Sequence, residues 1–236
     1  LSASLLDVPH EKSLAAGAAL EMVHSYSLVH DDLPDMDNDE LRRGKPTVWK
    51  AFDPALAILA GDALLTEAFA LLSDPRTHPD PAIRAELVLT LANAAGPTGM
   101  VGGQVLDIEG ETTVLDEDAI FQMQAKKTGA LIRAGVEMGA ILANATPAQR
   151  AELIRFGTAA GLAFQIADDI LDVTATSDAL GKTAGKDVAQ NKSTIVARRG
   201  VELNRAVADG LEALEDFGGE ANLLRRLIGH FAERKS

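Results

Sequence analysis

Apolar residues recur three and four positions apart through most of the chain, and alternating strand-like runs of Val, Ile and Tyr are absent. This spacing is typical of α-helices that bury one face. Prolines and glycines interrupt the pattern and mark the expected helix ends. The segments between them predict helices over about residues 11–31, 54–73, 80–95, 97–109, 117–144, 148–173 and 201–232.

These helices predict an all-α fold, a single-domain antiparallel helical bundle over residues 1–236. No Ser/Gly-rich linker divides the chain, and no repeat of solenoid period is visible. Facing helices of a bundle leave room for a site in its interior. The polar side chains that interrupt apolar helix faces are therefore the candidates for function.

Composition and charge narrow the classes of function. Hydrophobic residues make up 47% of the chain but aromatic residues only 4%, so the core must be mostly aliphatic. A formal charge of −13 argues against nucleic acid and anionic membrane surfaces as partners. The absence of cysteine excludes disulfides, a thiolate nucleophile and thiolate zinc sites, and it is compatible with a cytoplasmic location. The longest uncharged run, Leu87–Leu106, contains Gly96-Pro97 and Gly102-Gly103, so we expect no membrane span.

A first acidic cluster, residues 31–40, follows the predicted helix 11–31. Carboxylates at the C-terminal end of a helix are disfavoured by its dipole, so a cation should lie close to them. Asp35, Asp37 and Asp39 have the spacing of an EF-hand, but Glu40 stands where that loop needs Gly and Pro46 where it needs Glu. The sequence therefore excludes an EF-hand here.

A second acidic cluster, Asp168-Asp169-Ile170-Leu171-Asp172, lies near the end of an otherwise apolar predicted helix. Gln165, Asp168 and Asp172 share one face of that helix. Buried carboxylates without a counter-ion are costly, and Mg²⁺ prefers such oxygen ligands together with substrate phosphates. A carboxylate di-iron site would need Glu-x-x-His motifs, which are absent. The pair of clusters predicts a magnesium site, with a solvated acidic helix end as the alternative for each cluster alone.

Basic residues follow both clusters. Arg42-Arg43 come after the first, and Lys182 and Lys192 after the second. Gly181-Lys182-Thr183 lacks the leading glycine and preceding strand of a P-loop, so we interpret residues 177–187 as a lysine-bearing lid over bound phosphate, with a solvated loop as the alternative. Lys127-Thr128-Gly129 interrupts the predicted helix 117–144, which predicts either a kink that turns polar groups inward or an ordinary helix irregularity.

Taken in order, six sequence blocks resemble those of the short-chain trans-prenyl diphosphate synthases, with the bacterial farnesyl diphosphate synthases (geranyltranstransferases) the most similar group. The blocks are Asp31-Asp32-Leu33-Pro34-Asp35-Met36-Asp37 with Leu41–Gly44, then Gly61–Leu65, Gly99–Asp107, Lys127–Gly129, Phe164–Asp172, and Gly181–Asp187 with Lys192. The first block has the bacterial form, with two extra residues between the Asp pair and Asp37.

The resemblance implies a helical bundle around a central cavity, usually a homodimer, that condenses isopentenyl diphosphate with dimethylallyl or geranyl diphosphate by ionisation, condensation and elimination. It implies three Mg²⁺ ions per active site. The implied metal ligands are Asp31, Asp37 and Asp168, supported by Asp32, Asp169 and Asp172. Diphosphate would bind Arg42, Arg43, Lys127, Lys182 and Lys192, with Arg43 in the isopentenyl diphosphate site. The carbonyl oxygen near Lys127, the Thr128 hydroxyl and the Gln165 amide oxygen would stabilise the allylic cation. His24 and His30 are expected either to serve packing or to contact the residues that bind metal and substrate.

Tyr26 bears on product length. It lies five residues before Asp31, about 7.5 Å back along the helix. Within the resemblance, an aromatic residue at this position with the two-residue insertion implies farnesyl diphosphate (C15) as product. A smaller residue is more typical of geranylgeranyl diphosphate synthases, which remain the alternative.

Two departures from the resemblance affect these expectations. The Gly-Gly-Lys-x-x-Arg element that precedes Leu1 in the family is absent, so we expect an N-terminal segment to be missing from this sequence. Arg198-Arg199 stand where the family usually has apolar residues, and further residues are expected to be missing near 197–200. The rival functions are a terpene cyclase, a head-to-head synthase and a non-catalytic partner subunit. Intact acidic motifs and scarce aromatic residues favour the linear prenyltransferase.

Overall fold

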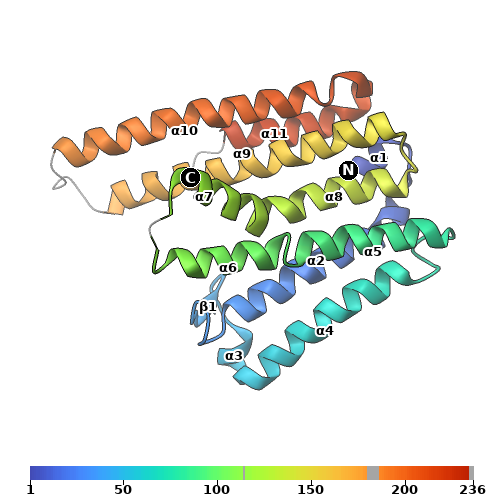
Figure 1. The fold of residues 1–236 in the computed structure, drawn as a ribbon, viewed down its shortest axis with the longest axis horizontal. Coiled ribbons are helices and arrows are strands. Elements are labelled where there is room, and N and C mark those ends of the chain that lie inside the picture. Colours follow the sequence, from blue (N-terminus) through green and yellow to red (C-terminus); the bar gives the residue numbers. More distant parts are fainter. Residues whose placement is uncertain (114, 180–185, 234–236) are drawn as a thin grey trace. The chain divides into compact units, whose positions relative to one another are not determined.

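Helices form nearly all of the regular structure in the computed structural model (Figure 1), which describes residues 1–113, 115–179 and 186–233, with side chains of 172–197 not included. Contacts within the chain define two compact units, Pro9–Leu91 and a second that joins Leu1–Val8 to Ala92–Ser236. The single-domain organisation stays a prediction.

The unit Pro9–Leu91 is built on α2 (His10–Asp31) packed against α4 (Pro54–Ser73). Helix α4 begins at a proline, and the side chain of Asp53 accepts a hydrogen bond from the amide of Leu56 at 2.8 Å. Proline at the first helical position preceded by an Asp cap is a favourable helix start, so the predicted range 54–73 is confirmed at both ends. Helices α3 (Val48–Ala51) and α5 (Pro81–Ala95) are the others that begin in this unit, and α5 matches the predicted 80–95 closely.

Small side chains allow α2 and α4 to approach closely. Ala16, Ala19, Val23 and Tyr26 form the buried stripe of α2, at spacings of three and four. A Cβ atom at Gly61 of α4 would lie only 2.1 Å from Nε2 of His30. His30 therefore packs into the space that this glycine leaves, and its Nε2 lies 3.0 Å from the carbonyl oxygen of Ile58.

A short hairpin follows α2 and was not predicted. Strands β1 (Leu41–Arg42) and β2 (Lys45–Pro46) pair antiparallel, with Arg42 opposite Lys45. The two turn residues, Arg43 and Gly44, have φ of 51° and 76°. Positive φ at both positions is the geometry of a type I′ turn, whose twist suits a two-residue hairpin.

The second unit packs α8 (Ala130–Leu142), α9 (Pro147–Ala179), α10 (Lys186–Glu212) and α11 (Asn222–Glu233) around one core, with α1 (Ser2–Leu5) against α8. Phe156, Leu153 and Ile166 of α9 and Ile228 of α11 are almost fully buried in it. Aliphatic and alanine side chains dominate this core, as the composition predicts. Helix α9 contains the predicted 148–173, and α6 (Met100–Gly110) covers most of the predicted 97–109.

Two predicted helices differ from the structure. The range 117–144 consists of α7 (Glu117–Gln124), a π-helical turn over Ala125–Gly129 and α8, so the predicted interruption at Lys127-Thr128-Gly129 is confirmed. The prediction of one helix over 201–232 is wrong. Helix α10 begins earlier, at Lys186, and a 3₁₀ segment (Glu215–Ala221) separates it from α11, because Gly218 takes a φ of 64° that an α-helix does not allow.

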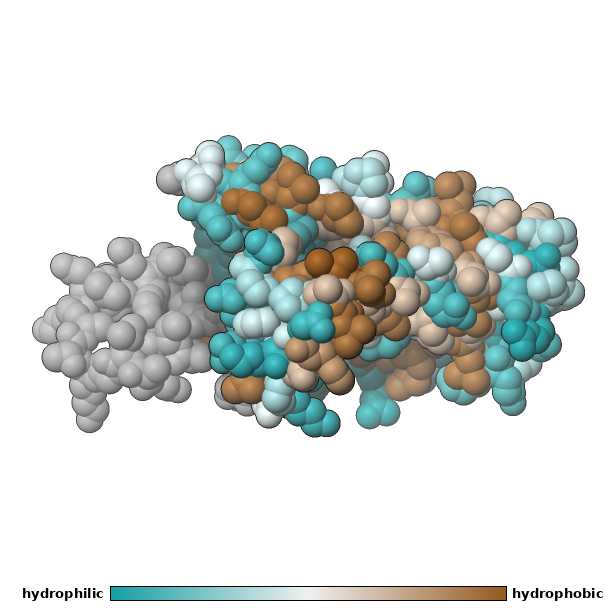
Figure 2. Space-filling view, turned by 90° about the horizontal axis from the view of Figure 1, so that it is seen from below, coloured by the Kyte–Doolittle hydropathy of each residue, from teal (hydrophilic) through white to brown (hydrophobic). Residues whose placement is uncertain are grey.

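Helix α4 alone, among the residues that the structure describes, is long and apolar enough to cross a membrane by length and composition. This is weak evidence of a membrane span, because core helices of water-soluble proteins also meet the same length and composition criterion. Leu56, Ile58 and Leu59 of α4 are 44%, 46% and 63% exposed. Apolar residues also gather among polar ones on the face drawn in Figure 2.

Candidate active site

The end of α2 carries the first acidic cluster on a loop that folds back onto the helix. The amide of Asp37 donates to the carbonyl oxygen of Asp31 at 2.8 Å, and the amides of Met36 and Asn38 donate to the carbonyl oxygen of Leu33. The two-residue insertion is thereby absorbed in a tight turn. As a result Asp37, rather than Asp35, has its backbone hydrogen-bonded to Asp31.

Asp32 lies beneath this loop and is only 3% exposed. Its carboxylate accepts from Arg42 of β1, whose Nε lies 2.8 Å from Oδ1 and 3.0 Å from Oδ2. This hydrogen bond raises the pKa of Arg42, with further contributions from the charges of Asp32, Asp39 and Asp31. Arg42 is therefore the cation that the helix-end carboxylates were expected to need.

Tyr26 lies on the same helix, buried at 7% exposure and in edge-to-face contact with His30 at 5.7 Å between ring centroids. Burial raises the pKa of its hydroxyl, and the negative charge of Asp31 raises it further. Tyr26 is thus a neutral aromatic side chain close to the acidic end of α2.

In the second unit, the π-helical turn Ala125–Gly129 is held between two helices that approach it through glycines. A Cβ at Gly103 of α6 would lie 2.2 Å from the amide nitrogen of Lys127, and one at Gly161 of α9 would lie 3.0 Å from the Cα of Gly129. The Nζ of Lys127 forms an ion pair with Oδ2 of Asp107 at 2.6 Å. Backbone contact from α6 and a side-chain ion pair to it therefore fix the position of Lys127.

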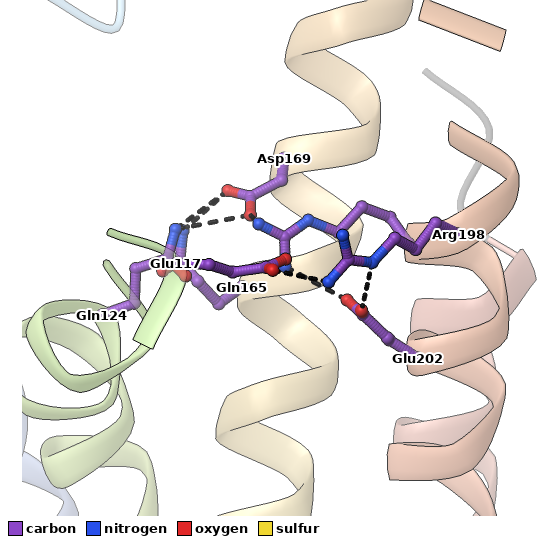
Figure 3. Close-up of polar contacts among 7 residues, drawn as sticks. Glu117, Gln124, Gln165, Asp169, Arg198 and Glu202 are labelled. Atoms are coloured by element: carbon purple, nitrogen blue, oxygen red, sulfur yellow. Dashed lines mark hydrogen bonds and ion pairs between the residues drawn. The ribbon is translucent and has the colours of Figure 1, made fainter. Parts of the chain in front are cut away.

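The second acidic cluster lies on α9, and Asp169 is the centre of a polar network (Figure 3). Nε2 of Gln124 donates to Oδ1 of Asp169 at 3.1 Å, and Nε2 of Gln165 donates to the same oxygen at 3.4 Å. Nη2 of Arg199 lies 3.8 Å from the other oxygen, Oδ2. Side chains from α7, α9 and α10 therefore converge on the carboxylate of Asp169.

The comparisons with known proteins agree with the sequence blocks. The sequence model of the polyprenyl synthetase family matches residues 1–218. The chain belongs to this family. It is 44% identical over 226 residues to a farnesyl diphosphate synthase of Micrococcus luteus, covering 94% of this chain and 77% of that protein.

Further polyprenyl synthetases show similar identity. A farnesyl diphosphate synthase of Geobacillus stearothermophilus is 48% identical over 186 residues, 78% of this chain and 62% of that protein. A chloroplastic geranylgeranyl pyrophosphate synthase of Capsicum annuum is 43% identical over 87% of this chain and 58% of its own length. The chain thus spans less than two thirds of the length of these two relatives.

A solved structure, the apo form of an FPP/GFPP synthase from Zymomonas mobilis, superposes with a TM-score of 0.81 at 40% identity, covering 98% of this chain and 80% of that one. The family resemblance and the all-α fold are therefore both confirmed.

Within this polyprenyl synthetase, the structure brings together some of the predicted site residues. Asp31, Asp32, Asp37 and Arg42 meet at the end of α2, and Gln165 meets Asp169. The two acidic clusters lie in different compact units, so their joint site stays a prediction. Among the described residues no group of three or more His, Asp or Glu side chains is arranged to hold a metal. Asp172, Lys182 and Lys192 lie outside the described side chains.

Sequence reasoning missed the partners of the predicted residues. Asp107 lies within the block Gly99–Asp107, but nothing in the sequence indicates that it pairs with Lys127. Gln124 carries no sequence signal. Arg199 was visible as a departure from the family pattern, and only the fold shows that it reaches Asp169.

Proposed function

We propose that this polyprenyl synthetase is a magnesium-dependent prenyltransferase that condenses isopentenyl diphosphate with dimethylallyl or geranyl diphosphate to give farnesyl diphosphate. The names of its relatives support this reaction. The structural observation that carries the proposal is the end of α2, where a tight turn binds Asp37 to Asp31 beside the Asp32–Arg42 pair. Aspartates and an arginine thus lie at one helix end, where we propose that they bind metal and diphosphate.

The chemistry of the carboxylates fits magnesium. The ligands we propose are Asp31, Asp37 and Asp168, with Asp32, Asp169 and Asp172 in support, for three ions per site. Carboxylate oxygens are the donors that Mg²⁺ prefers, and it binds through few of them when substrate phosphates complete the coordination. Bound Mg²⁺ would neutralise the charge of the diphosphate leaving group.

Cations of the chain would bind the diphosphates. Arg42, Arg43, Lys127, Lys182 and Lys192 are the residues that we propose for this role. Arg42 and Lys127 each pair with a carboxylate, Asp32 and Asp107. These ion pairs hold both side chains in place, and positioned donors lower the cost of ordering a bound anion.

Oxygen dipoles would stabilise the allylic cation. Because the amide nitrogen of Gln165 donates to Asp169, its carbonyl oxygen is the end turned away from that carboxylate. The π-helical turn at Lys127 and Thr128 shifts backbone hydrogen bonds away from the α-helical pattern, which frees carbonyl oxygen for the same task. Attack by the double bond of isopentenyl diphosphate and loss of a proton complete the condensation, with the departing diphosphate as base.

Product length is the point on which geranylgeranyl diphosphate synthesis is the second candidate, since relatives carry that name too. We propose the C15 product because Tyr26 is a buried aromatic residue and lies close enough to Asp31 for the charge of Asp31 to raise its pKa. A side chain of this size would block a growing chain that extends along α2. The aliphatic composition of the helices suits a linear prenyl chain.

We also propose that the enzyme is a cytoplasmic homodimer. The apolar residues Leu56, Ile58 and Leu59 of α4 are exposed in the single chain, and a second copy would remove them from water. Sedimentation equilibrium of the full-length protein tests this, with a dimer mass expected and a monomer mass contradicting it.

The test of the proposed reaction uses the full-length protein with Mg²⁺, isopentenyl diphosphate and dimethylallyl diphosphate. Asp31→Ala and Asp168→Ala should each abolish formation of prenyl products while the helical circular dichroism signal is retained. Asp209→Ala, on the exposed surface of α10, is the matched control and should keep full turnover. Full activity of either motif variant contradicts the proposed metal role.

A further inference from the structure

Arg199 is the less exposed member of the Arg198-Arg199 pair on α10. Its side chain is 15% exposed, whereas that of Arg198 is 63% exposed. The guanidinium of Arg199 lies over the ring of Phe121 at 4.7 Å from the centroid, and its Nη1 donates to Glu202 at 3.1 Å. The cation–π contact with Phe121 and the hydrogen bond to Glu202 restrain the guanidinium from two directions.

The remaining edge of this guanidinium faces the second acidic motif. Nη2 of Arg199 lies 3.8 Å from Oδ2 of Asp169, and Asp169 is 24% exposed. Arg198 shares Glu202, at 3.3 Å, but its other partner is Glu117, at 2.5 Å, and not Asp169 (Figure 3). Of these two adjacent arginines, only Arg199 contacts Asp169 of the second acidic cluster.

Asp169 dictates the orientation of two neutral amides. Both Gln124 and Gln165 direct Nε2 toward it. The Oε1 of Gln124 is buried and has no hydrogen-bond partner among the described residues. An unpaired buried oxygen is unfavourable, so this orientation is kept because the charged carboxylate requires donors.

We propose that Arg199 is a positioning residue, which holds the Asp169 carboxylate in place so that Asp169 orients the amide of Gln165 and is not a direct metal ligand. Without the arginine, the carboxylate would keep only the two amide donors among the described residues and could rotate away from Gln165. The carbonyl oxygen of Gln165 would then lose its fixed direction. The role assigned to Gln165 rests on the proposed function.

Kinetics of matched arginine variants test the positioning role. Arg199→Leu should lower kcat by about tenfold while KM for both diphosphates stays within about threefold, because an orienting contact acts on the transition state more than on binding. Arg199→Lys keeps the charge and should recover part of the loss. The control Arg198→Leu should stay within about twofold of wild type. Equal kcat values for the Arg199→Leu and Arg198→Leu variants overturn the proposal.

A double-mutant cycle tests whether Arg199 acts through Asp169. Asp169→Asn should lower kcat by a similar factor. The kcat of the double variant Arg199→Leu/Asp169→Asn should be no more than about threefold below that of the less active single variant. If the loss of kcat in the double variant equals the product of the two single losses, the residues act independently, and this result contradicts the proposal. The same cycle, measured on unfolding midpoints in metal-free buffer, reports the coupling of the pair without any substrate.

Calorimetry with Mg²⁺ and inorganic pyrophosphate separates positioning from metal ligation. Asp169→Asn should leave this binding within about threefold of wild type if the side chain does not coordinate the metal, whereas removal of a direct carboxylate ligand should weaken it far more. A tenfold loss overturns the proposal. Failure of the wild-type protein to make any prenyl product would instead refute the proposed function and the role of Gln165, while the unfolding cycle would still decide the Arg199–Asp169 coupling.

Discussion

The guanidinium of Arg42 donates to both carboxylate oxygens of Asp32, with its Nε 2.8 Å from Oδ1 and 3.0 Å from Oδ2. Asp32 is buried at the end of α2, and Arg42 belongs to the hairpin that follows it. The sequence motifs assign these residues to different tasks, metal and diphosphate. In the fold they also form one ion pair, which neutralises a buried charge and ties the hairpin to the helix.

Removal of Arg42 should therefore destabilise the fold as well as weaken substrate binding. Arg42→Ala leaves Asp32 buried without its cation, and the expected loss is about 2–3 kcal/mol of unfolding free energy, below the usual range for a buried pair because Arg42 is partly exposed. Urea denaturation followed by circular dichroism measures it.

The adjacent Arg43 provides the control, since it is exposed and the structure gives it no ion pair among the described residues. Arg43→Ala should change the unfolding free energy by no more than about 0.5 kcal/mol. Equal losses of unfolding free energy for the two variants would show that the Asp32–Arg42 pair contributes no more to stability than an exposed arginine does.

Gly103 is predicted to be intolerant of even one added methyl group. A Cβ there would lie 2.2 Å from the amide nitrogen and 2.6 Å from the Cα of Lys127, so α6 or the π-helical turn must move. Gly103→Ala should cost about 2 kcal/mol of stability, typical of overpacking. It should also lower kcat by about tenfold, because Lys127 and Thr128 are displaced.

Gly200→Ala is the comparison for this prediction. Gly200 lies on α10, and a Cβ there would meet no atom within 4 Å. Replacement of a helical glycine by alanine in open space should stabilise the protein by about 0.5–1 kcal/mol. Similar behaviour of the two alanine variants in denaturation and turnover would contradict the described packing at Gly103.

Tyr26 should limit the length of the product. Tyr26→Ala removes the side chain that we propose as the floor of the chain pocket, so products should shift from C15 toward C20 when isopentenyl diphosphate is in excess. Tyr26→Phe keeps the ring and should keep the C15 product. Chain-length analysis by mass spectrometry distinguishes these outcomes, and C15 alone from the Tyr26→Ala variant would refute the floor assignment.

The raised pKa of Tyr26 has a consequence for alkaline stability. Burial and the charge of Asp31 place its folded pKa above the ordinary value of about 10. A raised tyrosine pKa means that the folded state favours the neutral form, so this stabilisation is complete below pH 10 and is lost as the pH rises through the folded pKa.

The comparison of wild type with Tyr26→Phe isolates this effect. Between pH 8 and about pH 11, the wild-type protein should lose more unfolding free energy than the phenylalanine variant, as measured by urea midpoints. Parallel curves for the two proteins would mean that the hydroxyl of Tyr26 does not titrate with a raised pKa.

Local sequence signals predicted the parts of the fold that depend on local chemistry. Asp53-Pro54 fixes the start of α4, and Lys127-Thr128-Gly129 marks the π-helical turn. The hairpin was missed because its strands have two residues each, too few for a periodic pattern. The break at Gly218 was missed because the apolar spacing continues on both sides of it.

The candidate site likewise contains residues that the sequence predicts and residues that only the fold reveals. Motif residues such as Asp31 and Asp168 can be read from the sequence, because their spacing is characteristic. Their partners cannot, since Lys127 finds Asp107 and Asp169 finds Arg199 only through packing between helices distant in the sequence. Charge balance predicts that a cation must approach each acidic cluster, but not which one.

Product analysis tests most directly whether the protein catalyses magnesium-dependent C15 prenyl transfer. Full-length protein would be incubated with isopentenyl and geranyl diphosphate, with Mg²⁺ or with excess EDTA, and the dephosphorylated products separated by chain length. We expect farnesol with Mg²⁺ and no prenyl product with EDTA. Absence of any prenyl product with Mg²⁺, or equal turnover in EDTA, would contradict this expectation.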